Sequence, residues 1–184
     1  MVATAKGVSD ELGKAKDLSP EDADKLYHTI GLGALKYFIL RVDPKKTMLF
    51  NPEESIDFNG NTGPFVQYTH ARICSVLRKA AEQGIRFENE VKVADLQPKE
   101  KEIIVMMYSW PTVLNQAAEG RSPAMIANFI YDLAKEFNQF YQECSILREE
   151  DENRRMFRLQ VCAMVAALLR NASSLLGIGM PERM

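Results

Sequence analysis

The chain has 184 residues, enough for one domain or for one domain with a connecting segment. Its apolar fraction of 46% and charged fraction of 26% are ordinary for a soluble globular protein. The formal net charge of −2 excludes a general electrostatic attraction to nucleic acids or acidic membranes. Any nucleic-acid site must therefore be a local cluster of cations on a nearly neutral body.

The N-terminal part of the chain changes character near residue 19. Residues 1 to about 18 are polar, mixed in charge and contain two glycines, so we expect them to be frayed or flexible, with no signal peptide. A helix is expected to begin at Pro20, because Ser19 can cap it and two acidic residues follow. Gly31 and Gly33 inside this helix indicate a close approach by another element.

The rest of the chain is predicted to be helical, after a loop or short extended segment over 41–58 that holds two prolines and no helical period. The expected helices span residues 64–84, 101–110, 111–120, about 123–144 and about 151–176. The second half of the last helix is apolar almost all round, which predicts the central helix of a bundle. Its longest apolar run, 161–169, is too short to span a bilayer. The fold class is therefore predicted to be all-α, an antiparallel helical bundle.

Motifs that would mark a self-contained enzyme are absent from the sequence. There is no phosphate-binding glycine loop, dinucleotide fingerprint, zinc-protease helix or nucleophile elbow. Cys74, Cys144 and Cys162 show no metal-ligand spacing, and the chain has only two histidines. We expect buried, reduced thiols of a cytosolic protein, with no catalytic residue and no metal site.

One helix face carries side chains that the core does not need. The turn NGNTGP leads into a helix whose spacing places Phe65, Tyr68, Arg72, Ser75 and Lys79 near one another. Aromatic rings that can stack on unpaired bases, beside cations that can bind phosphates, are typical of single-stranded RNA recognition. The alternative is that the two aromatic side chains simply pack against a neighbouring helix.

Four stretches, taken together and in order, resemble the C-terminal part of arginyl-tRNA synthetase, a class I aminoacyl-tRNA synthetase. They are GLGALKYFIL, FNGNTGPFVQYTHARICSVLRKA, SPAMIANFIYDLAKEFNQFYQECSIL and RLQVCAMVAALLRNASSLLGIGMPERM, and the match covers about residues 19–184. The resemblance implies an anticodon-binding helical bundle over 59–184. It also implies that 1–58 form a flexible N-terminus and a helical segment leading to a catalytic core. The HIGH-like and KMSK-like signatures of that core are absent. We therefore expect this chain alone to be inactive and to bind no cofactor, neither ATP nor arginine.

The resemblance also implies which residues surround the anticodon loop. In the family, aromatic positions matching 65, 68 and 129 and the C-terminal methionine lie there; Phe at 65 and 129 replaces the usual Tyr and loses a hydroxyl. His70 falls on the apolar stripe and is expected to orient the helix. The expected RNA-binding residues are Asn61, Phe65, Tyr68, Arg72, Lys79, Phe129 and Met184.

The genetic code sharpens this expectation. All arginine codons have G in the middle, so every arginine anticodon has C there, and reading one base selects the whole set. Backbone groups of the NGNTGP turn, the C-terminal tail or a carboxylate after Met184 are hypothetical partners of that base.

The expected partners are the tRNA(Arg) anticodon loop and the catalytic domain of the parent chain. We expect a monomer in the cytoplasm, without membrane association. Three rival interpretations remain: a helical interaction or dimerisation module without RNA affinity, using the apolar helix 161–176; a self-contained enzyme; and a paralogue that binds another RNA or none.

Overall fold

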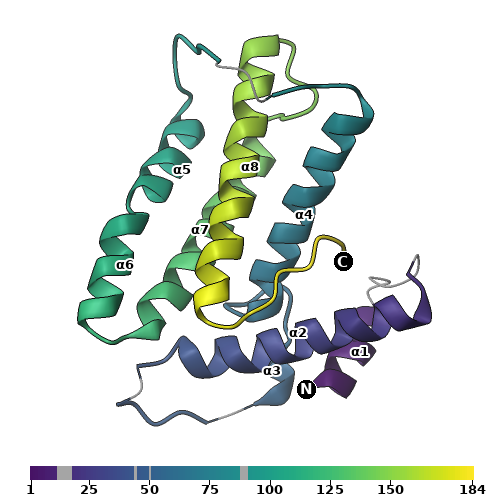
Figure 1. Ribbon diagram of the computed structural model, residues 1–184, viewed down its shortest axis with the longest axis vertical. Helices are drawn as coiled ribbons and strands as arrows, with labels where there is room; N and C mark the ends of the chain where they lie inside the picture. The colour runs from purple at the N-terminus through teal and green to yellow at the C-terminus, as the bar shows by residue number, and fades with distance from the viewer. Residues whose placement is uncertain (12–17, 44, 50, 88–90) are drawn as a thin grey trace.

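The computed structural model describes every residue except 12–17, 44, 50 and 88–90, and the described part contains helices and no strand. The helices are α1 (Val2–Glu11), α2 (Pro20–Leu40), α3 (Pro52–Ser55), α4 (Gly63–Glu82), α5 (Pro98–Tyr108), α6 (Trp110–Glu119), α7 (Pro123–Glu143) and α8 (Glu152–Leu175). In Figure 1, α4 and α7 run in one direction along the bundle, whereas α5, α6 and α8 run in the other. Helix α2 crosses one end of this bundle, with α1 against it. The predicted all-α antiparallel bundle is confirmed.

Local capping signals fix several helix ends. Ser19, Thr62 and Asp151 are N-caps, and the side-chain oxygen of each accepts a backbone N–H from the first turn of its helix. Gly84 and Gly177 adopt left-handed φ angles of 72° and 65° just after α4 and α8. These ends are therefore encoded locally, which is why the sequence predicts them closely.

The centre of the bundle is α7, which packs against α2, α4, α5, α6 and α8. Its buried residues include Phe129, Ile130, Leu133, Phe137 and Phe140. The prediction that residues 161–176 form the central helix is wrong, because α8 leaves Met164 and Leu175 exposed. Several apolar residues of α8 are alanines, which favour a helix whether or not they are buried. The apolar composition of this helix therefore predicted more burial than the structure shows.

The N-terminal stretch differs from the frayed segment expected, because Val2–Glu11 forms α1. A Cβ added at Gly31 would lie 3.0 Å from the Cα of Val2, so the glycine lets α1 approach α2 closely. Ala5 and Ser9 are buried in the same contact. A helix of ten residues is marginal alone, so packing rather than local propensity accounts for it. Residues 12–17 of the expected flexible stretch lie outside the described residues.

Helices α2 and α4 cross in direct backbone contact. A Cβ at Gly63 would lie 2.7 Å from the carbonyl oxygen of Gly33, and a Cβ at Gly33 would meet the side chain of Gln67. The prediction that Gly31 and Gly33 mark a close approach is confirmed. The segment expected to be a loop over 41–58 contains one helical turn, α3. The crossing fixes the start of α4, which carries the predicted aromatic and cationic face.

Candidate nucleic-acid interface

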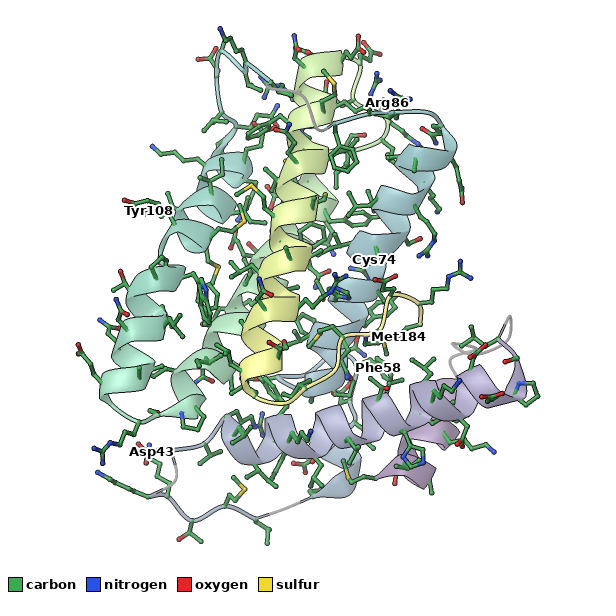
Figure 2. All side chains as sticks on the ribbon, in the orientation of Figure 1. Asp43, Phe58, Cys74, Arg86, Tyr108 and Met184 are labelled. Atoms are coloured by element: carbon green, nitrogen blue, oxygen red, sulfur yellow. The ribbon has the colours of Figure 1, made fainter. Side chains whose placement is uncertain are left out.

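A cavity of about 300 Å³ opens between α4, α7 and the C-terminal tail. Four of the seven predicted RNA-binding residues line it: Tyr68, Arg72, Lys79 and Met184. Tyr141 of α7 and Leu147 of the following loop complete its walls. We call this the Tyr68 cavity. The fold thus brings the last residue of the chain to the middle of α4, as Figure 2 shows for Met184.

Arg72 lies between two tyrosine rings. Its guanidinium carbon is 4.9 Å from the ring centroid of Tyr68 and 5.4 Å from that of Tyr141. Nη1 of Arg72 donates to Oδ1 of Asn138, whose Nδ2 donates to the Thr69 hydroxyl at 3.0 Å. A planar cation held in this way keeps both rings in fixed positions. Arg72 is therefore held between two aromatic rings, with one guanidinium nitrogen bonded to a neutral amide.

Lys79 is a different kind of cation. It is exposed, one turn of α4 beyond Ser75, and among the described residues it has neither an ion pair nor a side-chain hydrogen bond. An unpaired ammonium group at the edge of an aromatic cavity can approach a phosphate without breaking a contact. Of the two predicted cations, Lys79 is thus the one whose side chain has no partner among the described residues.

Tyr141, which lines the Tyr68 cavity, and Asn138, which bonds to Arg72, carry no signal that singles them out in the sequence. They lie one turn apart on α7, beside the apolar stripe that contains Phe137. Tyr141 is 40% exposed, although the ring is large and apolar. Helical spacing shows that they share an edge of α7. Which surface of α4 this edge meets depends on how the two helices pack.

Gln67 joins α4 to α2 and to the C-terminal tail. Its Nε2 donates to the carbonyl of Thr29 in α2 at 3.0 Å and to that of Gly179 in the tail at 2.8 Å. The side chain is fully buried. Since buried polar groups are costly unless paired, these two bonds specify where the tail leaves α8 and turns back along α4 (Figure 1).

His70 fixes the tail further along. The imidazole is fully buried, with Nδ1 2.9 Å from the carbonyl oxygen of Pro181. A carbonyl only accepts hydrogen bonds, so Nδ1 carries the proton. Burial lowers the pKa of His70 and favours the neutral ring with its proton on Nδ1, although the bond to Pro181 by itself acts in the opposite direction. His70 therefore positions the C-terminal tail, a role more specific than the expected orientation of its own helix.

The other three predicted residues lie towards the α2 end of the bundle, away from the Tyr68 cavity. Phe65 is half-buried against Tyr131, with ring centroids 5.3 Å apart. Phe129 is only 6% exposed and packs on Trp110 at 5.0 Å. Asn61 accepts the hydroxyl of a buried tyrosine of α2 at its side chain. Both phenylalanines therefore pack against aromatic side chains of a neighbouring helix.

The remaining candidates for chemistry show no built site. Within the described residues, no group of three or more histidine, cysteine or acidic side chains is placed to hold a metal ion. Cys144 and Cys162 are buried and Cys74 is half-buried; all three are unpaired, and burial raises the pKa of each thiol. No helix in the described part of the chain is long and apolar enough to cross a bilayer.

Comparison with known proteins identifies the class to which this fold and groove belong. The DALR anticodon binding domain family matches residues 66–184, so the chain belongs to that family. Over its full length the chain is 55% identical to an arginine–tRNA ligase of Flavobacterium psychrophilum and 56% identical to one of Bacteroides fragilis. It covers 30% and 31% of those proteins, and thus spans about a third of their length.

Solved structures agree with this assignment. An arginyl-tRNA synthetase from Thermus thermophilus superposes on the whole chain with a TM-score of 0.89 and 28% identity, over 31% of its own length. An arginyl-tRNA synthetase from Plasmodium falciparum matches with a TM-score of 0.80 at 23% identity, a likeness of fold alone.

Proposed function

We propose that this chain is the anticodon-binding part of an arginine–tRNA ligase and that it binds the anticodon loop of tRNA(Arg). The observation that carries this proposal is the Tyr68 cavity. In a chain of the DALR family, an aromatic ring, an unpaired cation and the C-terminal methionine converge on one cavity from distant positions in the sequence. Stacking of an unpaired base on such a ring contributes ~1–3 kcal/mol and a nearby cation adds phosphate attraction.

Each cavity residue has a distinct part in the proposed complex. Tyr68 and Met184 enclose an unpaired base, and we assign this position to the middle C that all arginine anticodons share. Lys79 meets the adjoining phosphate. Arg72 keeps the rings of Tyr68 and Tyr141 apart and in place. In this proposal residues 59–184 form the binding unit and 1–58 link it to a catalytic domain.

The aminoacylation reaction itself belongs, in this proposal, to another part of the parent enzyme. We propose that ATP and arginine bind a catalytic domain that carries the HIGH-like and KMSK-like signatures, and that this chain alone neither binds them nor aminoacylates tRNA. The partners are then tRNA(Arg) and that catalytic domain, in a cytoplasmic and monomeric protein. Incubation of the chain with arginine, ATP and tRNA should yield no arginyl-tRNA, and any product would contradict this division.

A dimerisation module is the less supported alternative. The helix that suggested it, α8, buries Val161, Val165 and Leu169 within its own chain, so most of its apolar stripe is already covered, although Met164 and Leu175 remain exposed. Sedimentation at two protein concentrations separates the readings, because a dimerisation module would show a mass that rises with concentration.

Fluorescence anisotropy with an arginine anticodon stem-loop tests the proposed function. We expect clear preference over a stem-loop whose middle C is changed to G, at low and at moderate salt. Tyr68→Ala should weaken binding about fivefold or more. Tyr108→Ala is the matched control, since this tyrosine is 86% exposed on α5 and points away from the bundle (Figure 2). Equal affinity for both RNAs that disappears with salt would contradict base reading.

A further inference from the structure

We infer that the Tyr68 cavity continues into a second cavity that holds a neighbouring unpaired nucleotide of the same RNA strand. The inference rests on the proposed function, since it extends the groove assigned to the anticodon loop. We call the second space the Arg148 cavity, after the cation that distinguishes it.

The two cavities are connected through shared walls. The Arg148 cavity measures about 290 Å³ and lies between α4, the end of α7 and the loop that follows. Val76, Tyr141 and Leu147 line both cavities, whereas Ser145 and Arg148 line only the second. The combined groove therefore follows the seam between α4 and α7, from Met184 at one end to Arg148 at the other.

The second cavity is lined by a cation, Arg148, that has no carboxylate partner among the described residues. Arg148 is exposed, and within the described residues it forms neither an ion pair nor a hydrogen bond through its side chain. The next residue, Glu149, is paired instead with Arg158, with Nη1 and Oε2 2.6 Å apart. Together with Lys79 on α4, the groove therefore presents one unpaired cation beside each cavity, as two consecutive phosphates require.

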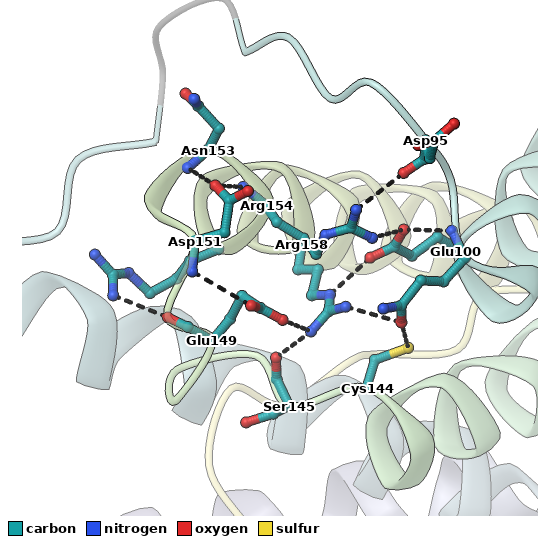
Figure 3. Close-up of polar contacts among 11 residues, drawn as sticks. Asp95, Glu100, Cys144, Ser145, Glu149, Asp151, Asn153, Arg154 and Arg158 are labelled. Carbon is teal, nitrogen blue, oxygen red and sulfur yellow. Dashed lines mark hydrogen bonds and ion pairs between the residues drawn. The ribbon is translucent and has the colours of Figure 1, made fainter.

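The wall of the Arg148 cavity is held rigidly from behind (Figure 3). Arg158 is only 2% exposed; its Nη1 donates to the carbonyl of Ser145 at 2.6 Å and its Nε to Glu100 Oε1 at 2.7 Å. Glu100 is fully buried and also accepts from Arg154 at 3.2 Å. These bonds anchor the loop after α7, so that a ligand in this cavity does not have to order it.

The chemistry of the groove favours a nucleic-acid strand as its occupant. Tyr141 lines both cavities, and each cavity has one unpaired cation among its lining residues, Lys79 in the first and Arg148 in the second. Stacked bases on aromatic rings with phosphates on flanking cations form the usual arrangement for unpaired strands. Each cavity is also near the lower size limit of small-ligand pockets, which suits a single base better than a large ligand.

Removal of the charge at Arg148 tests the inference. Arg148→Gln should weaken binding of the anticodon stem-loop about threefold to tenfold, and lower the slope of log affinity against log salt by about 0.7 to 1. Lys101→Gln is the matched control: this exposed lysine lies on α5, on neither cavity, so both quantities should stay unchanged.

Abasic nucleotides placed at each loop position in turn supply a second measurement. We expect two neighbouring positions at which loss of the base weakens binding. Tyr141→Ala should reduce the penalty at both positions, because Tyr141 lines both cavities, whereas Tyr68→Ala should reduce it at one. This readout reports base contacts and is not changed by a general effect on charge.

The possible outcomes separate the inference from the proposed function. If Tyr68→Ala abolishes binding while Arg148→Gln behaves like Lys101→Gln and one abasic position alone matters, the Arg148 cavity is no subsite and the proposed function stands. If the unaltered chain binds no stem-loop, both are overturned.

Discussion

In the proposed complex, Arg72 shapes the binding site and does not contact the ligand through its charge. Its guanidinium is covered by Tyr68 on one side and Tyr141 on the other, and its Nη1 is engaged by Asn138. A lysine at this position would supply the same charge on a compact ammonium group. Only a planar guanidinium, however, fills the space between two rings and bonds sideways at the same time.

Arg72→Lys tests this role directly. We expect the free energy of unfolding to fall by about 1 kcal/mol, because two cation–π contacts of ~0.5–1 kcal/mol each are weakened. RNA affinity should fall about tenfold, since the rings lose their spacer. Urea unfolding and anisotropy measure the two effects. Arg86→Lys, at an exposed arginine near the end of α4 (Figure 2), should change neither quantity.

His70 predicts a dependence of stability on pH. Burial lowers the pKa of His70 below the value of about 6.5 expected in the unfolded chain. The unfolded state therefore binds more protons between these two pKa values, and the free energy of unfolding falls as the pH drops below about 6.5. Above that pH His70 is neutral in both states, and the free energy of unfolding keeps its full value.

Urea unfolding at pH 7.5 and pH 5.5 measures this effect. His70→Asn keeps a donor near Pro181 but cannot titrate, so its stability should change less between the two pH values than that of the unaltered chain. His28→Asn, at an exposed histidine, should retain the full change. An unaltered pH dependence in His70→Asn would assign the effect to other groups.

Among the elements, the crossing of α2 and α4 decides where the cavity forms. Two glycines from different helices meet there, and Gln67 bonds across the contact to α2 and to the tail. A side chain at either glycine would push α4 outward and move Tyr68 relative to Met184. The crossing therefore couples the stability of the bundle to the shape of the binding surface.

Gly33→Ala separates packing from helix propensity. An alanine favours a helix by about 1 kcal/mol over glycine, yet here its Cβ would meet Gln67, and overpacking costs ~1–3 kcal/mol. We expect a net loss of unfolding free energy of about 1 kcal/mol and weaker RNA binding. Gly7→Ala in α1 has no heavy atom within 4 Å of the new Cβ and should be neutral or stabilising. Urea unfolding of both variants measures the contrast.

Sequence patterns predicted the helices where local chemistry determines them. Ser19, Asp151 and Gly84 act within one turn of their own helices, so their effect is visible without the fold. Helix α1 was not predicted, because its stability comes from contact with α2 at Gly31, a partner distant in sequence. The position of α7 at the centre was missed for the same reason: burial belongs to the assembled bundle.

The candidate site divides in a similar way. Tyr68, Arg72 and Lys79 lie along one face of a single helix, so spacing alone placed them together. The inclusion of Met184 came from resemblance to a family, and the structure brings it to the same cavity. Tyr141 and Arg148 enter through the packing of α7 on α4, which no spacing within either helix encodes.

At the scale of the whole molecule, the bundle has a polar anchor at the end opposite α2. Arg158 and Glu100 are buried together there, and their bonds join α5, α8 and the loop after α7 (Figure 3). A buried ion pair adds little net stability over apolar packing, but loss of one partner leaves an uncompensated charge. This anchor therefore holds three segments in one arrangement.

Glu100→Gln should expose that dependence. We expect the free energy of unfolding to fall by about 3 kcal/mol, because Arg158 keeps its charge and loses a buried partner. Glu102→Gln is the control on the same helix: its carboxylate pairs with Lys99 at a half-exposed position, where solvent screens the pair and its loss should cost little. Equal losses in the two variants, measured by urea unfolding, would contradict a structural role for the buried pair.

Trp110 gives the molecule a spectroscopic signal of its own. It is the single tryptophan of the chain, and it rests on Phe129 at the far side of α7 from the Tyr68 cavity. Its emission should therefore report the unfolding of the α6–α7 contact and stay constant while RNA fills the groove. Quenching on RNA addition would instead mean that the strand extends to the surface above Phe129. A single fluorescence titration therefore distinguishes a short bound strand from a long one.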